Sequence, residues 1–392
     1  MKKYKTLSVL IFFCASLNAQ SSIDAILTGI LASNKALRAE AQRVEAVQKE
    51  LQTGLWPYDP AISFDYMRGF PETAGNQSDL TISQSFDFPS AYARRRELAS
   101  LRSAQTAFES AALRQSILLE AKLTCLQLVF LNRKKSELAR RIGHAEQFLA
   151  AMQKKYDALD ATALDLNKAG QQVIRLKTSV RLTDTEISGQ LTMLAELNGG
   201  QPIPFSDTLY PPAPELPPLD ELQQAFAAAD PVLNFFKSQQ NAGEAEIALA
   251  KALALPKMEA GYRYQGILGQ NFHGLHMGIT VPLWENKNRI AQRQLQSIYY
   301  AGQLEEHRNR NQYDLMQLYQ HYRDMLENLD QYRQNLRAFN SSELLDKALQ
   351  AGQISTLEFF LEQSLLCDSR DQVLELERAV EVAAAKLWKY LL

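Results

Sequence analysis

Apolar and polar residues alternate strictly in four short segments of the chain, which is the pattern of strands with one apolar face. The first two segments predict a β-hairpin over residues 60–88, in which Ile62, Phe64 and Tyr66 share one parity and polar residues share the other. The last two segments predict a second hairpin over residues 257–284. The chain therefore contains at least four strands, grouped in two pairs.

Long stretches without proline flank the hairpins, and they are rich in helix-forming residues. One helix is expected from Ile23 to about Leu55, before Trp56-Pro57, and a shorter one over residues 230–255. Each hairpin is followed by a very long helix and a return helix. These four helices cover residues 91–157, 162–198, 287–350 and 355–391. At 1.5 Å per residue, the first long helix would be roughly 100 Å long.

The second long helix carries apolar residues at alternating spacings of three and four. Such a heptad seam indicates that the helix packs along its length against neighbouring helices. The seam consists of Leu315, Leu318, Tyr322, Met325, Leu329, Tyr332, Leu336 and Phe339.

The same order of elements occurs twice, so the chain is an internal duplication, which sets its architecture. Matched points are offset by 199, 197 and 193 residues, and they pair Trp56 with Leu255, Phe86 with Leu283, and Ala161 with Ile354. We assign a first repeat to residues 20–198 and a second repeat to residues 220–392. A proline-rich linker over residues 199–219 joins them.

The N-terminus predicts export. A basic start, a short apolar run and a small-residue cleavage site indicate a signal peptide over residues 1–19, with lipidation at Cys14 as an alternative. No other stretch reaches the 18 apolar residues of a transmembrane helix. The mature chain keeps Cys125 and Cys367, either as two separate buried thiols, the favoured interpretation, or as a disulfide, which export permits.

The composition argues against several functions. The net charge of -2 provides no basic field, so we expect no nucleic-acid partner. The sequence has no glycine-rich phosphate loop and no nucleophile elbow, so we expect no enzyme, no catalytic residue and no cofactor. The five histidines show no metal-ligand spacing with cysteine, and His273 and His276 would point to opposite faces of a strand. We expect no metal site.

The predicted strands are long enough to cross a bilayer when tilted. A soluble sheet would show the same alternation, but the export signal and the absence of helical spans favour a membrane location. Four strands cannot close a spanning barrel, because known examples have at least eight. An open edge in lipid would leave backbone groups unpaired, at several kcal/mol each. Three chains would supply twelve strands, and the long helices would continue the barrel as a tube.

Three segments carry a resemblance to a known family. The junctions "ISQSFDFPSAYARRREL" and "GITVPLWENKNRIAQRQL" and the turn "KALQAGQISTLEFFLEQSLL" are similar to motifs of TolC-type outer-membrane efflux proteins. The resemblance implies an α+β membrane protein, in which a homotrimer forms a twelve-stranded outer-membrane β-barrel and an α-helical coiled-coil tunnel through the periplasm of a Gram-negative cell. It also implies three kinds of partner: outer-membrane lipid, a periplasmic adaptor (membrane-fusion) protein and an inner-membrane pump of the RND type.

The resemblance places adaptor contacts at the turns between the long and return helices, which we call the tips. The second tip would dock through Ala351, Gly352, Gln353, Ile354 and Ser355. A glycine in such a turn also has a purely structural reason, a positive φ. The first tip would use Leu159, Asp160 and Ala161, with Leu159 where the family usually has glycine. Equal adaptor contact at the two tips is therefore not expected.

Two acidic residues lie six positions beyond the tips, Asp165 and Glu358. The resemblance implies that they surround the mouth of the tunnel and form its constriction. Three copies of a carboxylate around one axis would favour cations and respond to pH. The alternative is that both are ordinary exposed helix residues.

Taken together, these features predict a passive exit duct for metal cations or small organic compounds, with metal cations slightly favoured. An exit duct for secreted polypeptides, of the type I secretion class, would use the same fold. A candidate from another class is a soluble periplasmic coiled-coil scaffold or adaptor. An adaptor would need a glycine-rich β domain, which the sequence does not show.

Overall fold

The structure is a computed structural model that describes residues 22–338 and 342–392. The predicted signal peptide with Cys14, and Phe339 of the heptad seam, lie outside the described residues. Among the described helices, none combines the length and the apolar character needed to cross a membrane.

The two predicted hairpins lie side by side in one antiparallel sheet with the order β1-β2-β3-β4. The central pair, β2 and β3, comes from different repeats, and Ile82 lies opposite Tyr262. Strands β1 and β4 are the edges, so each has one side without a paired strand. The strands are β1 (Ala61–Arg68), β2 (Asn76–Phe86), β3 (Lys257–Ile267) and β4 (Gln270–Thr280).

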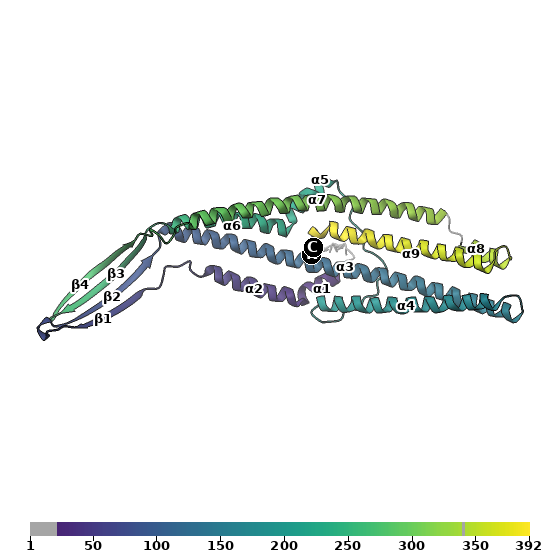
Figure 1. Cartoon of the computed structure of the whole chain (residues 1–392), viewed down its shortest axis with the longest axis horizontal. Coiled ribbons are helices and arrows are strands. Elements are labelled where there is room, and N and C mark those ends of the chain that lie inside the picture. Colours follow the sequence, from purple (N-terminus) through teal and green to yellow (C-terminus); the bar gives the residue numbers. More distant parts are fainter. Residues whose placement is uncertain (1–21, 339–341) are drawn as a thin grey trace, which may run out of the picture.

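One face of the sheet is apolar and exposed to solvent in the single chain. The register puts Ile62, Ile82, Tyr262 and Leu275 in one row across the four strands. Their exposed fractions are 70%, 40%, 41% and 81%. The opposite face is polar, as the alternation predicts. A soluble domain would have to cover this apolar face with another element, and Figure 1 shows the sheet standing alone at one end of the molecule.

The helices extend from the sheet in one direction and give the chain its elongated shape (Figure 1). The first long helix, α3, has 69 residues and so spans roughly 100 Å. The helices are α1 (Ser22–Ser33), α2 (Lys35–Gln52), α3 (Pro89–Asp157), α4 (Ala163–Leu197), α5 (Leu219–Ala229), α6 (Pro231–Leu253), α7 (Arg289–Ala338), α8 (Ser342–Gln350) and α9 (Thr356–Leu387), with short 3-10 turns at Glu72–Ala74 and Lys389–Leu391.

Helix α3 is the axis of the arrangement. Helices α2 and α4 pack on it, and so do α6 near the sheet and α9 towards the tips. Helix α7 packs on α6 and then on α9, so these two shorter helices lie between α3 and α7. The chain is therefore a thin curved layer of helices, with α2 and α4 along one border and α7 along the other (Figure 1).

The cores lie in the middle of the molecule. Ile30, Leu128 and Leu194 are fully buried where α1, α3 and α4 meet. Burying side chains of this size contributes about 2 kcal/mol each. A second core joins α5, α7 and α9 and contains Tyr322 and Leu387. Every described position of the heptad seam is buried or half-buried, so the seam is confirmed for these residues.

The first helix differs from the sequence-based expectation, because it is interrupted at Asn34. The Asn34 backbone is extended, and its Oδ1 accepts a hydrogen bond from the Leu37 backbone N–H at 3.0 Å. Its Nδ2 donates to the Leu197 carbonyl at 2.7 Å. Asparagine is a favoured N-cap, and this tertiary bond to the end of α4 fixes the break. The prediction of one continuous helix from Ile23 to about Leu55 was therefore wrong.

Candidate functional site

The two tips have the same backbone structure. Leu159 and Gly352 occupy equivalent positions, with φ values of 65° and 69°. At the first tip the Asp160 N–H donates to the Lys155 carbonyl, and the Leu159 N–H donates to the Tyr156 carbonyl. The equivalent pair of hydrogen bonds forms around Gly352. Both long segments therefore end in a Schellman motif, which normally requires glycine at this position.

Each return helix then begins with a capping box. At the first tip the Thr162 Oγ1 accepts a hydrogen bond from the Asp165 N–H at 3.2 Å, and Thr162 donates back to the Asp165 carboxylate. At the second tip Ser355 and Glu358 form the same reciprocal pair. The six-residue spacing of the acids from the tips therefore has a structural cause: each is the third residue of its helix.

The capping bonds also set the charge of the two acids. The hydrogen bond from the Thr162 side chain lowers the pKa of Asp165, and the bond from the Ser355 backbone lowers the pKa of Glu358. Both carboxylates are thus ionised at neutral pH. They lie at the same end of the molecule, at the starts of α4 and α9 (Figure 1). No contact between them is described within one chain.

The residues predicted for docking all lie at this end of the molecule. Six of the eight are exposed and two are half-buried; the eight are Leu159, Asp160, Ala161, Ala351, Gly352, Gln353, Ile354 and Ser355. The two tips differ in one respect. Leu159 places a large apolar side chain, 92% exposed, on a backbone conformation that costs a non-glycine residue about 1 kcal/mol.

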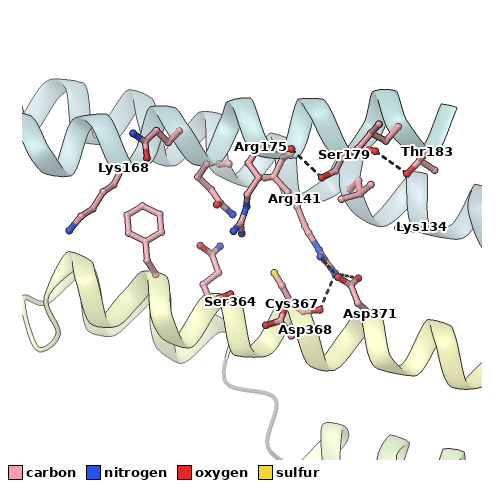
Figure 2. A pocket seen from close by; sticks show the side chains of 18 of the residues that line it. Lys134, Arg141, Lys168, Arg175, Ser179, Thr183, Ser364, Cys367, Asp368 and Asp371 are labelled. Atoms are coloured by element: carbon pink, nitrogen blue, oxygen red, sulfur yellow. Dashed lines mark hydrogen bonds and ion pairs between the residues drawn. The ribbon is translucent and has the colours of Figure 1, made fainter. Parts of the chain in front are cut away.

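Behind the tips, a groove of about 780 Å³ runs between the α3–α4 pair and α9. Figure 2 shows that Arg141, on α3, reaches across this groove to α9. The guanidinium binds the Asp371 carboxylate at 2.6 Å and 2.9 Å and donates to the Cys367 carbonyl at 3.2 Å. Its Nε also bonds Glu137 at 2.9 Å. One nearly buried arginine thus holds the two tip-forming helix pairs together.

A second ion cluster joins the repeats closer to the sheet. The Glu246 carboxylate, on α6, is 8% exposed and lies between two arginines. It pairs with Arg102 of α3 at 2.5 Å and with Arg293 of α7 at 2.9 Å. This carboxylate on α6 therefore connects α3, the long helix of the first repeat, with α7, the long helix of the second.

Glu377, on α9, makes the equivalent bridge on the tip side. It is 7% exposed and pairs with Arg133 of α3 at 2.6 Å and with Arg333 of α7 at 2.5 Å. Sequence reasoning missed both bridges, because their partners are tens to hundreds of residues apart. The one local signal is that Glu377 interrupts the apolar spacing between Val373 and Val380.

The cysteines and histidines form no joint site in the described residues. Cys125 and Cys367 are both free, so the interpretation of two separate thiols is confirmed. Burial raises the pKa of both thiols. His273 contacts Tyr262 on the apolar face of the sheet, and His276 lies on the opposite face. Within residues 22–338 and 342–392, no group of three or more His, Cys, Asp or Glu side chains could hold a metal ion.

Comparison with known proteins gives structural matches only, since no family model and no curated protein matches the chain. The chain is similar to CusC, a transmembrane channel protein, at 14% identity and a TM-score of 0.82, over 96% of this chain and 92% of that one. The outer membrane protein VceC of Vibrio cholerae matches at 13% identity and a TM-score of 0.79, with coverages of 94% and 95%. The CmeC outer membrane channel of Campylobacter jejuni matches at 10% identity and a TM-score of 0.77, with coverages of 94% and 85%. The chain therefore has the TolC-type fold of these outer-membrane channels, as the sequence predicted.

Proposed function

We propose that the protein is the outer-membrane exit duct of a tripartite efflux system, a passive channel made by three copies of the chain. One observation carries this proposal: a four-stranded sheet with two open edges and an exposed apolar face stands at the end of helices roughly 100 Å long. The likeness to CusC and to the outer-membrane proteins VceC and CmeC supports it.

The open edges explain why several copies are needed. In hydrocarbon, each unpaired N–H or C=O of β1 and β4 costs several kcal/mol. Strand β4 of one chain can pair with β1 of the next, and three chains close a ring of twelve strands. The apolar face, with Ile62, Phe64 and Leu275, then turns outward to lipid, and the polar face lines the lumen.

The tips would meet the other parts of the system. The helices carry them far from the membrane, to where a periplasmic adaptor protein and an inner-membrane pump of the RND type would dock. Gly352 and Leu159 give the two tips different surfaces, so the adaptor would contact them unequally. In a trimer, Asp165 and Glu358 would place six carboxylates near the mouth, which favours metal cations or cationic organic compounds as cargo.

The experiment is fractionation followed by a channel measurement. We expect the mature protein in the outer-membrane fraction, as a trimer that resists heating in detergent and conducts ions in planar bilayers. Recovery of a monomer from the soluble periplasm would instead support a scaffold and refute the duct. Metal and drug sensitivity of a deletion strain, compared with its secretion of polypeptides, then separates efflux from type I secretion.

A further inference from the structure

Two exposed tryptophans mark one end of the sheet. Trp56 precedes the edge strand β1 by five residues, and Trp284 follows the edge strand β4 by four. Their exposed fractions are 76% and 79%. The third tryptophan of the chain, Trp388, is 5% exposed in the helical core. Tryptophan favours the boundary between apolar lipid and water, so this end of the sheet has the character of a membrane interface.

Directly beyond the tryptophans, the chain carries more cations than acids. Six basic and four acidic residues lie in residues 56–60, 86–97, 257 and 281–289, which gives a net charge of +2 per chain. Three of the cations are paired: Arg94 with Glu97, Arg95 with Asp87, and Lys257 with Glu285. The other three, Arg96, Lys287 and Arg289, are exposed and make no ion pair with any described carboxylate.

The dimensions put these cations at the level of lipid headgroups. Strands of 11 residues, tilted by about 45°, give an apolar band roughly 26 Å tall. Arg289 is the first residue of α7, and Arg96 lies about 10 Å along α3 from its start. Long basic side chains extend their charge towards headgroups while their stems cover apolar surface.

We propose that Trp56 and Trp284, together with Arg96, Lys287 and Arg289, form a collar that binds the anionic headgroups of phospholipids in the leaflet through which the helices emerge. The inference rests on the proposed function, because it needs the sheet to enter a bilayer. Along the molecule, the apolar face of the sheet is followed by the two tryptophan rings and then by these three cations. A bilayer presents the matching layers in the same order: acyl chains, the lipid–water interface and the headgroup phosphates. In the proposed trimer the collar repeats three times and concentrates nine of these cations in one ring.

The tryptophans allow a direct test. The full-length mature protein is reconstituted in phosphatidylcholine vesicles that contain a small fraction of phospholipid brominated close to the headgroup, either phosphatidylcholine or phosphatidylglycerol. We expect brominated phosphatidylglycerol to quench the fluorescence of Trp56 and Trp284 at least threefold more effectively at equal mole fraction. A Trp56→Phe/Trp284→Phe variant retains only Trp388 and should show almost no quenching.

The charge contribution is tested by Arg96→Gln/Lys287→Gln/Arg289→Gln, which should abolish the preference for phosphatidylglycerol. The matched control, Lys154→Gln/Lys155→Gln/Lys347→Gln, removes three exposed cations at the tip end, which make no ion pair with any described side chain, and should leave the preference intact. Inorganic phosphate at millimolar concentration should not displace the brominated lipid, because a free anion lacks the acyl chain that the apolar band holds.

The outcomes separate the collar from the channel. Equal quenching by the two brominated lipids, or a preference that survives the triple substitution, overturns the collar and leaves the channel standing. Displacement by phosphate also overturns it, in favour of a simple anion site. If neither lipid quenches any tryptophan, the sheet does not enter the bilayer, and the proposed function fails together with the collar.

Discussion

The bridge at Glu377 offers a sharp test of how the two repeats are held together. The carboxylate is 7% exposed and binds one arginine from each long helix, Arg133 and Arg333. Glu377→Gln keeps the shape of the side chain and removes its charge. The two guanidinium groups then face each other without a carboxylate between them.

The expected cost follows from burial. Breaking a buried ion pair costs about 3–5 kcal/mol. The side chain of Arg333 is 42% exposed and that of Arg133 is 28% exposed, so solvent screens part of their charge. The amide can also still accept one hydrogen bond. We therefore expect Glu377→Gln to lower the free energy of unfolding by about 2 kcal/mol.

The assay is urea unfolding of the purified protein, followed by the helical circular dichroism signal. Glu375→Gln is the matched control, because it removes the same group from the same helix, where Glu375 is 45% exposed and pairs with Arg378 one turn away. Its cost should stay below about 0.5 kcal/mol. Equal losses from the two substitutions, or a loss at Glu377 below 0.5 kcal/mol, would refute the bridge as a connection between the repeats.

Three further predictions concern Glu381 on α9 and the two tips. Burial raises the pKa of Glu381 to about 7, so the folded state disfavours its ionised form; the contribution of Glu381 to stability is full below about pH 4.5 and is lost as the pH rises through 7. Thermal unfolding at pH 5 and pH 8 should show this dependence, and Glu381→Gln should reduce it. Leu159→Gly should stabilise the first tip by about 1 kcal/mol because it removes the strained backbone, whereas Gly352→Ala should destabilise the second tip by a similar amount. Hydrogen exchange of the tip amides measures both; a first tip destabilised by Leu159→Gly, or a second tip stabilised by Gly352→Ala, would contradict the strain argument. Asp165→Asn with Glu358→Gln keeps the caps but removes the charges, so the ratio of cation to anion permeability in planar bilayers should fall; an unchanged ratio would mean that the acids only cap their helices.

The elements with a local cause were predictable from the sequence. Alternation located the strands, and the absence of proline located the long helices, because both signals lie within a few neighbouring residues. The tip motif around Gly352 was visible for the same reason. The equivalence of Leu159 was visible only through the duplication, since a leucine alone gives no sign of a positive φ.

Features that depend on distant partners were not predictable. The break at Asn34 is fixed by the carbonyl of Leu197, which is 163 residues away in the chain. The bridges at Glu246 and Glu377 require arginines from both long helices. A single sequence contains no information on which of its many charged residues meet, because ion pairing follows from packing and leaves no periodic pattern.

The bridges also show how the duplication is broken. Both buried carboxylates come from the second repeat and connect α3 to α7 within one chain, whereas the outer borders of the layer, α4 and α7, carry exposed apolar residues such as Ile174 and Leu182 on α4 and Leu295 and Ile298 on α7. In the proposed trimer, the α2 and α4 border of one chain would face α7 of the next, with α2 at the level of the sheet end of α7 and α4 at the level of its tip end. The contacts between chains would then include these exposed apolar side chains, whereas the contacts between α3 and α7 within a chain run through two buried ionic bridges beside the apolar cores. Any salt screens charge pairs. Only kosmotropic salts, such as sulfate and phosphate, also strengthen the burial of apolar surface. The two repeats are therefore alike in backbone, but their contacts within and between chains differ in chemistry, so conditions that loosen the ionic bridges within chains need not separate the chains.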